Sequence, residues 1–395
     1  MVALLPRNPN GNNGMRSVNY LVSNASRSVV KQSTRIFMVA GEASGDIYGG
    51  LLATELSDQT PAPTLRGWGG ENMGNAGVKI TKHYRELAYM GLWEVLVNLR
   101  TILSNLDLCW NEIEEFKPDA IVLIDFPGFN MRIARKAKKA GIRVYQVVAP
   151  QVWAWKKGRI KDLARDYTAV FPVLPFEHDL LKSGGVNSIY CGHPLLDAID
   201  SDSESESSSG FEKTTKPILA LLPGSRTQEL KKMLPLLCEV AKLFPDMHAI
   251  IAGAPGASKA LYLEAENLGI QVTFDSTRDI LRSASLAVVT SGTATLEAAL
   301  LSTPHVIVYK TSWLTYLAAK TFLHIDHIGL PNILLNRAAV PELIQSECTP
   351  KNIASSLSTL DVSSQKSSFR ELSSLLGNTT AIKEIASHIK DYPKN

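Results

Sequence analysis

The chain has 395 residues, of which 45% are hydrophobic and 20% charged, a composition that supports roughly two or three domains and excludes a disordered, collagen-like or coiled-coil protein. Its formal net charge of +3 arises in the first 41 residues, which hold five basic and no acidic side chains, so that the rest of the chain has 36 basic against 38 acidic ones. A general polyanion binder would carry a basic excess in its body, so we expect no nucleic-acid partner.

Residues 1–34 are predicted to be a transit peptide. They contain Ser, Asn and scattered Arg but no acid, and they lack the apolar core of about 7–15 residues that a secretory signal needs. The dense Arg and modest Ser content favour a mitochondrial over a plastid destination, and a disordered tail without a targeting role is the alternative. The predicted location is therefore the mitochondrion of a eukaryotic cell.

Residues 35–199 alternate short β-rich runs with amphipathic helical stretches, a pattern typical of βαβ units around a parallel sheet. We therefore predict an N-terminal Rossmann-like α/β domain over these residues. Its predicted strands are 36–39, 120–124, 144–148 and 169–173, and its predicted helices include 131–139 and 156–164.

Two loops of this domain follow predicted strands. Residues 41–46 read GEASGD, and such small residues before a helix let backbone N–H groups approach an anion; a tight turn capped by Ser44 or Asp46 is the alternative. Asp125 ends the run AIVLI, where apolar neighbours would raise the pKa of its carboxyl toward that of a useful base. The alternative role for Asp125 is to cap the following helix.

Residues 90–103 predict an amphipathic helix with Leu92, Trp93, Leu96 and Leu99 roughly on one face. This face would contact a membrane surface or an acyl chain, although the pattern alone favours a helix that faces the core.

Trp153, Trp155 and His193 also stand out in this domain. Tryptophans of this kind more often pack than bind sugars. His193 could act as an acid, a base or a hydrogen-bond donor, although a lone His beside Pro is more often a structural turn residue.

Residues 200–217 are acidic and Ser-rich and predict a linker or exposed loop. The pair Asp200 and Asp202 is similar to a metal-binding motif of some sugar transferases, but no strand delivers it to a site. Residues 218–395 predict a second Rossmann-like domain, whose tail from about residue 350 is helical and could pack back on the first. Two such domains would face each other across a cleft. The predicted strands of the second domain are 218–222, 248–252, 286–289 and 305–308.

Two loops of the second domain suit a nucleoside diphosphate. Arg226 ends the sequence PGSR directly after a strand, and its guanidinium can bind two phosphate oxygens without losing its charge; a structural salt bridge is the alternative. The sequence SGTATLE begins at Ser291, where hydroxyls at a helix start can hold phosphate and Glu297 can accept from a ribose diol. We predict a nucleotide site that needs neither a metal nor a cofactor.

The cysteines and apolar runs limit the remaining possibilities. The four cysteines are widely spaced without a CxxC pair, which suggests a reducing compartment or buried inert thiols. Apolar runs fall short of the ~20 residues of a spanning helix, so the chain is expected to be soluble or to lie on a membrane surface.

The ordered strings GEASGD, MGLWEVL, IDFPGFN, PQVWAW, LPFE, GHPLLD, LLPGSR, SGTATLE and LPN resemble those of lipid-A-disaccharide synthases, which are inverting glycosyltransferases of the two-domain GT-B type. The resemblance extends from about residue 35 to residue 348. Together with the leader, it suggests a plant mitochondrial member of this bacterial family.

The resemblance implies that UDP-2,3-diacylglucosamine is joined to 2,3-diacylglucosamine 1-phosphate through a β-1,6 bond with release of UDP. Asp125 is then the essential residue and candidate base, with His193 as the other candidate, and Arg226 lies at the diphosphate. The resemblance also implies a membrane-facing role for residues 90–103, which reverses the preference for a core helix, and a homodimer that exchanges C-terminal parts. The substrate and nucleotide contacts that it implies are Ser44, Arg226, Ser291, Gly292, Thr293, Glu297 and Asn332.

The sequence departs from the family at Gly128, which replaces an acid of some bacterial members, so a second carboxylate near Asp125 is missing from the expected position. The acidic linker is a further departure. Alternatives to the implied function are a UDP-N-acetylglucosamine epimerase, a transferase with a soluble acceptor, and a nucleotide-sugar or lipid-binding protein without turnover.

Overall fold

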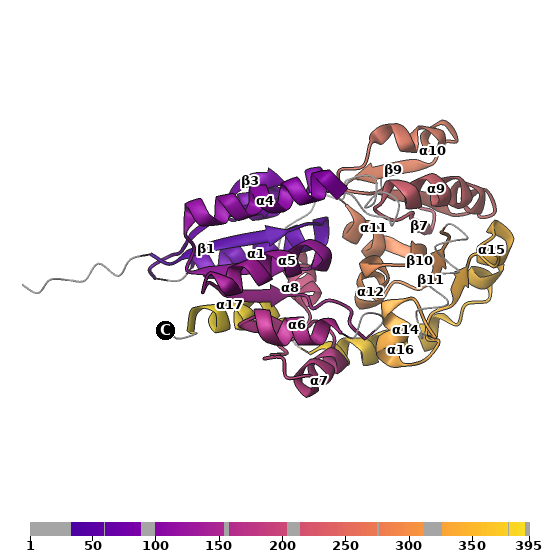
Figure 1. Ribbon diagram of the computed structural model, residues 1–395. Helices are drawn as coiled ribbons and strands as arrows, with labels where there is room; N and C mark the ends of the chain where they lie inside the picture. Colours follow the sequence, from indigo (N-terminus) through magenta and orange to yellow (C-terminus); the bar gives the residue numbers. More distant parts are fainter. Residues whose placement is uncertain are drawn as a thin grey trace, which may run out of the picture.

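The computed structural model describes residues 33–58, 60–87, 99–153, 158–203, 214–274, 276–311, 326–377 and 379–391. Two α/β lobes lie side by side, one formed by residues 33–203 and the other by residues 214–377 (Figure 1). The predicted transit peptide, most of the acidic linker and the side chains of Leu92, Trp93, Leu96, Leu99 and Trp155 lie outside the described residues.

The N-terminal lobe contains a six-stranded parallel sheet in the order β3-β2-β1-β4-β5-β6. Helices α1, α8 and α17 cover one face of the sheet, and α4, α5 and α6 cover the other. Both faces are therefore buried, which explains why the central strand β4, with the sequence AIVLI, is uniformly apolar. The strands are β1 (Arg35–Ala40), β2 (Thr64–Gly69), β3 (Lys79–His83), β4 (Ala120–Ile124), β5 (Arg143–Val147) and β6 (Ala169–Phe171); the helices are α1 (Ala43–Ser57), α2 (Glu71–Asn75), α4 (Leu99–Phe116), α5 (Pro127–Lys139), α6 (Arg159–Asp166), α7 (Pro175–Ser183), α8 (Pro194–Ser203) and α17 (Ala381–Asp391), with the 3-10 helix η1 (Tyr84–Leu87).

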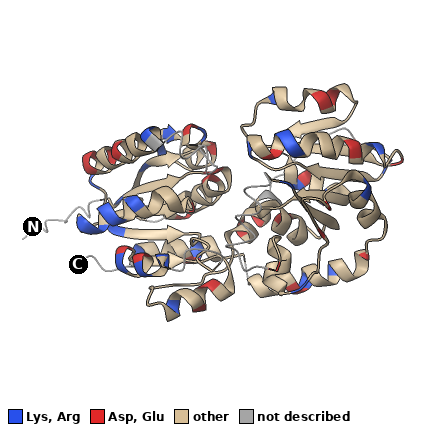
Figure 2. Ribbon diagram, turned by 45° about the vertical axis from the view of Figure 1, so that its right-hand side comes forward, with Lys and Arg blue, Asp and Glu red and all other residues tan. Residues whose placement is uncertain are grey.

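The C-terminal lobe contains a second six-stranded parallel sheet, in the order β12-β11-β10-β7-β8-β9. Most of the charged residues of both lobes lie on the helices (Figure 2). The strands are β7 (Ile218–Leu222), β8 (His248–Gly253), β9 (Gln271–Phe274), β10 (Ala284–Thr290), β11 (His305–Tyr309) and β12 (Glu342–Ile344); the helices are α9 (Thr227–Lys242), α10 (Leu263–Asn267), α11 (Thr277–Ser283), α12 (Thr293–Leu300), α14 (Leu330–Leu335), α15 (Pro350–Ser358) and α16 (Val362–Leu376), with the 3-10 helix η2 (Lys259–Tyr262).

Both sheets have the same doubly wound order, with β1 beside β4 in one lobe and β7 beside β10 in the other. The strand order reverses at these two pairs, and in open α/β sheets ligands bind in the crevice outside the carboxyl ends of the strands at such a point. The four loops singled out from the sequence follow β1, β4, β7 and β10. The topology therefore brings them in pairs to the two expected binding edges.

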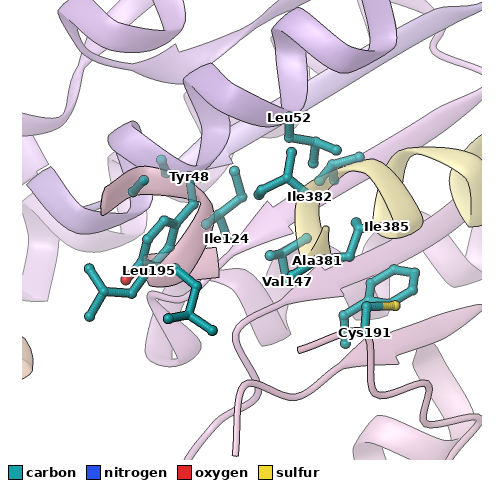
Figure 3. Close-up of a cluster of buried hydrophobic side chains, with 14 of the residues drawn as sticks. Tyr48, Leu52, Ile124, Val147, Cys191, Leu195, Ala381, Ile382 and Ile385 are labelled. Atoms are coloured by element: carbon teal, nitrogen blue, oxygen red, sulfur yellow. The ribbon is translucent and has the colours of Figure 1, made fainter. Parts of the chain in front are cut away.

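The C-terminal helix α17 packs on the N-terminal lobe, which is the arrangement that the sequence left open for the helical tail. Ile382 and Ile385 lie beside Leu52 and Val147 in one buried cluster (Figure 3). Asp197 of α8 accepts a hydrogen bond from the backbone N–H of Ile382 at 3.2 Å. The chain therefore returns to its first lobe because that lobe offers α17 an apolar surface and a cap.

All eight predicted strands are present, each within two residues at its ends. The predicted helix 131–139 begins earlier, at Pro127, and Asp200 belongs to the last turns of α8 rather than to a loop. All four cysteines are free and buried. No helix among the described residues is long and apolar enough to cross a membrane.

Candidate active site

Asp125 follows the central strand β4 in an uncommon backbone conformation. Asp125 has a φ of 47° and Phe126 a φ of 48°, so two successive residues other than glycine lie in the left-handed region. Each such residue costs on the order of 1–3 kcal/mol unless its surroundings hold it, and such residues concentrate at functional sites. The loop after β4 is therefore a strained turn at the binding edge of the sheet.

Gly41 packs this turn against the loop that follows β1. A Cβ atom at Gly41 would lie 2.3 Å from Cγ of Phe126, so only glycine permits the contact. The next residue, Glu42, is thereby held close enough to Asp125 for its negative charge to raise the pKa of Asp125. The GEASGD and IDFPGFN loops thus form one unit.

The carboxyl group of Asp125 has a pKa raised from 3.8 to about 7, first by burial and then by the negative charge of Glu42. A hydrogen bond from the Phe126 N–H and the charge of Arg226 oppose this rise. The residue as a whole is half-buried, so its carboxylate is poorly solvated although the residue is not fully covered. A group with this pKa is suited to accept a proton near neutral pH.

Glu42 supplies the second carboxylate that the sequence analysis considered missing. Burial raises its pKa, the positive charge of Arg226 lowers it and Glu229 raises it. Gly128, where the acid was expected, is exposed, and a Cβ there would meet nothing within 4 Å. The second acid therefore comes from the neighbouring strand end, and its signal in the sequence was the Glu within GEASGD.

Arg226 brings the C-terminal lobe to the same place. It is the N-cap residue of α9, and its side chain is 51% exposed. Its guanidinium Nη1 lies 3.5 Å from Oε1 of Glu229, and Nη2 lies 3.8 Å from Oε1 of Glu42 in the opposite lobe. The structure thus brings Arg226 and the Asp125 loop together across the two lobes.

The turn before α9 leaves backbone N–H groups at the helix start. Gly224 has a φ of 98°, and a Cβ there would lie 2.5 Å from Oε2 of Glu229. That carboxylate oxygen accepts from the N–H groups of Ser225 and Arg226 at 3.3 and 3.4 Å. These donors already hold an anionic group, as a helix N-terminus favours.

The second predicted phosphate loop lies beside the first, because β10 pairs with β7. Gly292 and Thr293 are exposed at the start of α12. The hydroxyl of Ser291 donates to the carbonyl oxygen of Ile328 at 3.0 Å and so holds the segment before α14 against the loop. Direct nucleotide contacts by these residues stay predictions.

Glu297 is part of an ion pair that the sequence did not indicate. Its Oε1 lies 2.6 Å from Nε of Arg278, and both side chains are largely buried. Arg278 also donates to the carbonyl oxygen of Ala198 in α8 at 2.7 Å. Glu297 is thus oriented by a residue that also ties the two lobes together, and its predicted ribose contact is untested.

The side chain of Asn332 makes its hydrogen bonds within the fold. It is fully buried; its Nδ2 donates to the carbonyl oxygen of Val340 and to Glu342, and its Oδ1 accepts from the N–H of Val340, all at 2.7–2.8 Å. The predicted nucleotide contact at Asn332 is therefore not favoured, because all its polar groups already have partners. It shapes the loop instead.

His193 is buried, and burial lowers the pKa of its imidazole to about 4. Its Nδ1 accepts from the N–H of Leu195 at 3.1 Å. These contacts favour the structural turn over the catalytic role. Ser44 is half-buried in the first turn of α1, and its substrate contact stays a prediction.

Asp46 of the GEASGD loop caps a different helix from the one expected. It is buried and accepts hydrogen bonds from the N–H groups of Gly70, Asn72 and Met73 at 2.6–3.2 Å. It therefore fixes the start of α2 rather than that of α1.

Glu177, in the LPFE string, is a buried acid that the sequence analysis did not single out. Burial raises its pKa to about 7, and the charge of Asp125 adds to this rise. Its Oε1 accepts from Nε1 of Trp153 at 2.8 Å. This hydrogen bond favours a structural role for Trp153.

Among the described residues, no group of three or more His, Cys, Asp or Glu side chains could hold a metal ion.

Comparison with protein families places these features in context. Residues 36–390 match the family model described as lipid-A-disaccharide synthetase. The lipid-A-disaccharide synthase of Syntrophus aciditrophicus is 35% identical over 372 residues, which cover 91% of this chain and 93% of the relative. That of Trichlorobacter lovleyi is 38% identical over 343 residues, covering 84% and 89% respectively.

Solved structures share the fold at much lower identity. A UDP-GlcNAc 2-epimerase from Neisseria meningitidis, bound to UDP-GlcNAc, matches with a TM-score of 0.64 and 14% identity, over 90% of this chain and all of its own. The calicheamicin glycosyltransferase CalG4 matches with a TM-score of 0.54 and 16% identity, over 91% and 98% of the two chains. The two-lobed arrangement is therefore the predicted GT-B fold.

Proposed function

This chain belongs to the lipid-A-disaccharide synthase family and is such an enzyme, and we propose that it condenses UDP-2,3-diacylglucosamine with 2,3-diacylglucosamine 1-phosphate. The product is a β-1,6-linked disaccharide 1-phosphate, formed with inversion at the anomeric carbon. One observation carries this assignment: a carboxyl group with a pKa of about 7 at Asp125 lies beside Glu42, which Arg226 of the opposite lobe approaches to 3.8 Å. A base and a diphosphate-binding cation thus meet between the lobes.

Asp125 is the base in this proposal. Its carboxylate takes the proton of the acceptor 6-hydroxyl while that oxygen forms the new bond to the anomeric carbon of the donor. The bond between this carbon and the phosphate oxygen breaks, and UDP leaves with the electron pair. With its pKa near 7, Asp125 is both substantially ionised and adequately basic at neutral pH.

Arg226 and the exposed start of α12 would stabilise the charge that grows on the leaving diphosphate. An arginine fork and helix N-terminal N–H groups need no reorganisation during the reaction, which makes such stabilisation effective. A diphosphate would compete for the guanidinium with Glu42 and Glu229, which approach it at 3.8 and 3.5 Å. Closure of the lobes would exclude water and protect the donor from hydrolysis.

We further propose that the enzyme works at a membrane surface. A groove between α4 and α5 has basic and apolar walls, and Leu103 in it is 50% exposed. Such a surface attracts anionic headgroups and accepts acyl chains, and Leu103 is the last residue of the predicted amphipathic segment 90–103. The groove is lined by Leu103, Leu106, Asp107, Arg132, Arg135, Lys136 and Lys139.

The assay incubates the purified protein with both acylated substrates and follows UDP and disaccharide together by mass spectrometry. The expected result is equimolar UDP and disaccharide, lost in Asp125→Asn. A second arm offers UDP-N-acetylglucosamine, because the fold is shared with UDP-GlcNAc 2-epimerases; epimerisation there would overturn the proposal. Substrate binding without product would identify a non-catalytic binding protein, and turnover of a soluble acceptor would identify the other alternative.

Membrane contact is tested by co-sedimentation with vesicles that contain anionic lipid. Leu103→Glu should weaken binding, whereas Leu243→Glu, at a leucine 48% exposed at the end of α9 in the other lobe, should not. Equal binding by both variants would contradict the proposed surface.

The proposed mitochondrial location of a plant protein is tested by fusing residues 1–34 to a fluorescent protein in plant cells. A diffuse or plastid signal would contradict it. The proposed homodimer is tested by light scattering on the purified chain, where a monomeric mass would contradict it.

A further inference from the structure

Two neighbouring strand ends in the N-terminal lobe share the same unusual conformation. Asp125 and Phe126 after β4 have φ values of 47° and 48°, and Val148 after β5 has a φ of 63°. For a β-branched residue such as valine this region is a genuine outlier. Since β4 and β5 pair in register from Ala120 to Ile124, these strained residues lie side by side at the binding edge.

One buried amide ties the two strand ends together. Gln146 is 0% exposed, although it lies within the apolar strand β5. Its Nε2 shares its two hydrogens among three carbonyl oxygens, those of Asp125 at 3.2 Å, Val147 at 3.2 Å and Val148 at 2.9 Å. The side chain therefore bridges the backbones of both strained turns.

A second buried amide reaches the same carbonyl group from α5. Asn130 is 0% exposed, and its Nδ2 donates to the carbonyl oxygen of Asp125 at 2.7 Å. That carbonyl oxygen thus accepts from two side-chain amides that arrive from different elements. Its peptide group is fixed from both sides.

These amides impose a cost that packing alone does not require. Within the described part of the chain, Oδ1 of Asn130 and Oε1 of Gln146 are buried without a hydrogen-bond partner. A buried acceptor without a donor loses its hydrogen bonds to water and gains none in the protein, which costs free energy. An apolar side chain of the same shape would avoid this cost. Both amides are explained by the backbone carbonyl group of Asp125, which they hold in place.

We propose that Gln146 and Asn130 are positioning residues, which clamp the carbonyl group of Asp125 and so hold its backbone in the left-handed turn that places its carboxylate beside Glu42. This inference rests on the proposed function only for the role of Asp125 as base. The clamp itself follows from the contacts.

The turn also sets the protonation behaviour of Asp125. In this conformation the N–H of Phe126 donates to the Asp125 carboxylate and lowers its pKa. If the clamp is removed and the turn relaxes while the carboxyl stays buried, that donor is lost and the pKa rises above about 7. The other groups that are electrostatically coupled to this carboxylate are Glu42 after β1, Arg226 before α9, Glu177 in α7 and Tyr48 in α1.

The C-terminal lobe offers a matched control. Gln365 is also buried and also clamps one backbone residue: its Oε1 accepts from the N–H of His305 at 2.8 Å, and its Nε2 donates to the carbonyl oxygen of His305 at 2.9 Å. His305 begins β11, at the end of the sheet opposite to the binding edge. Gln365→Met removes a comparable amide away from the site.

The experiment compares Gln146→Met with Gln365→Met in kcat, donor KM and the pH profile of kcat/KM. For Gln146→Met we expect kcat to fall by about ten- to a hundredfold, donor KM to stay within about twofold, and the acidic limb to move up by roughly half to one pH unit. Gln365→Met should lower the melting temperature but leave kcat and the limb unchanged. A wild-type kcat and limb in Gln146→Met would overturn the proposal, as would a loss of kcat in proportion to the unfolded fraction.

Two further measurements keep the inference testable if Gln146→Met folds poorly or if the proposed reaction is wrong. Asn130→Leu removes the second donor and should shift the limb in the same direction. The titration of the Asp125 carboxyl, identified by infrared difference against Asp125→Asn, needs no turnover. It should move to higher pH in either clamp variant, and an unchanged titration in both would refute the clamp even where the wild type lacks the proposed activity.

Discussion

Replacing Asp125 by Asn should stabilise the fold at alkaline pH. The pKa of this carboxyl is raised from 3.8 to about 7 in the folded protein, so the folded state keeps a proton that the unfolded state has already lost between these pH values. Wild-type stability therefore falls as the pH rises through this window, and it levels off above about pH 7. Asn does not titrate, so Asp125→Asn does not undergo this loss.

The magnitude follows from the shift. About three pKa units at about 1.4 kcal/mol each give an upper limit of about 4 kcal/mol. Because the side chain is only half-buried and solvent screens part of this energy, we expect about 2 kcal/mol. For a lobe of this size, that corresponds to a rise in melting temperature of about 4–8 °C.

The assay is urea and thermal unfolding of the wild type and Asp125→Asn at several pH values from about 4 to 8. The difference should be near zero at the acidic end and reach its maximum above about pH 7. Asp361→Asn serves as the control of opposite sign, because the Ser364 N–H lowers the pKa of this exposed helix cap. Its loss of stability should be present throughout this pH range and vanish only in a further series that extends below the ordinary pKa of 3.8. A difference between wild type and Asp125→Asn that does not depend on pH would refute the reasoning.

Three further results are expected. The kcat/KM of the wild type should fall about tenfold per pH unit below about 7, the pKa of Asp125. Glu42→Gln should move this acidic limb of the pH profile to lower pH, because the substitution removes a charge that raises the pKa of Asp125. An acidic limb at the wild-type pH would contradict the coupling between the two carboxylates. Arg226→Ala should lower kcat/KM by about 10²–10³, and full activity would remove Arg226 from the diphosphate site. Ile385→Ala should destabilise the N-terminal lobe by about 2–5 kcal/mol, measured by urea unfolding, because the side chain is buried against that lobe; an unchanged midpoint would show that α17 does not support it.

The strands that could be predicted are those buried on both faces. Apolar runs such as Ala120–Ile124 and Ile218–Leu222 are strands at the predicted residues. Strand β2, with the sequence TLRGWG, was missed because Gly and Arg interrupt its apolar pattern. A Cβ at Gly67 would lie 1.9 Å from the carbonyl oxygen of Met38, so this glycine serves a close approach of two strands that propensity cannot reveal.

The site could be predicted in part because residues that directly follow parallel strands lie at the carboxyl edge of the sheet. Asp125 and Arg226 each follow a buried strand, and parallel strands bring such residues to the binding edge of their own sheet. That the two edges face each other, with Arg226 at 3.8 Å from Glu42, depends on how the lobes pack. Glu42 as the second acid could not be predicted, since its proximity depends on the packing of Gly41 against Phe126. The polar partner of Glu297 is Arg278, which belongs to another helix, and those of Asn332 lie beyond the end of α14.

The pKa of Asp125 depends on both lobes. The N-terminal lobe raises it through burial and the charge of Glu42, and the C-terminal lobe lowers it through Arg226. Any movement of one lobe against the other changes the distance between Arg226 and the carboxylates, and with it the basicity of Asp125. A donor whose diphosphate neutralises Arg226 would therefore strengthen the base at the moment when an acceptor hydroxyl is to be deprotonated.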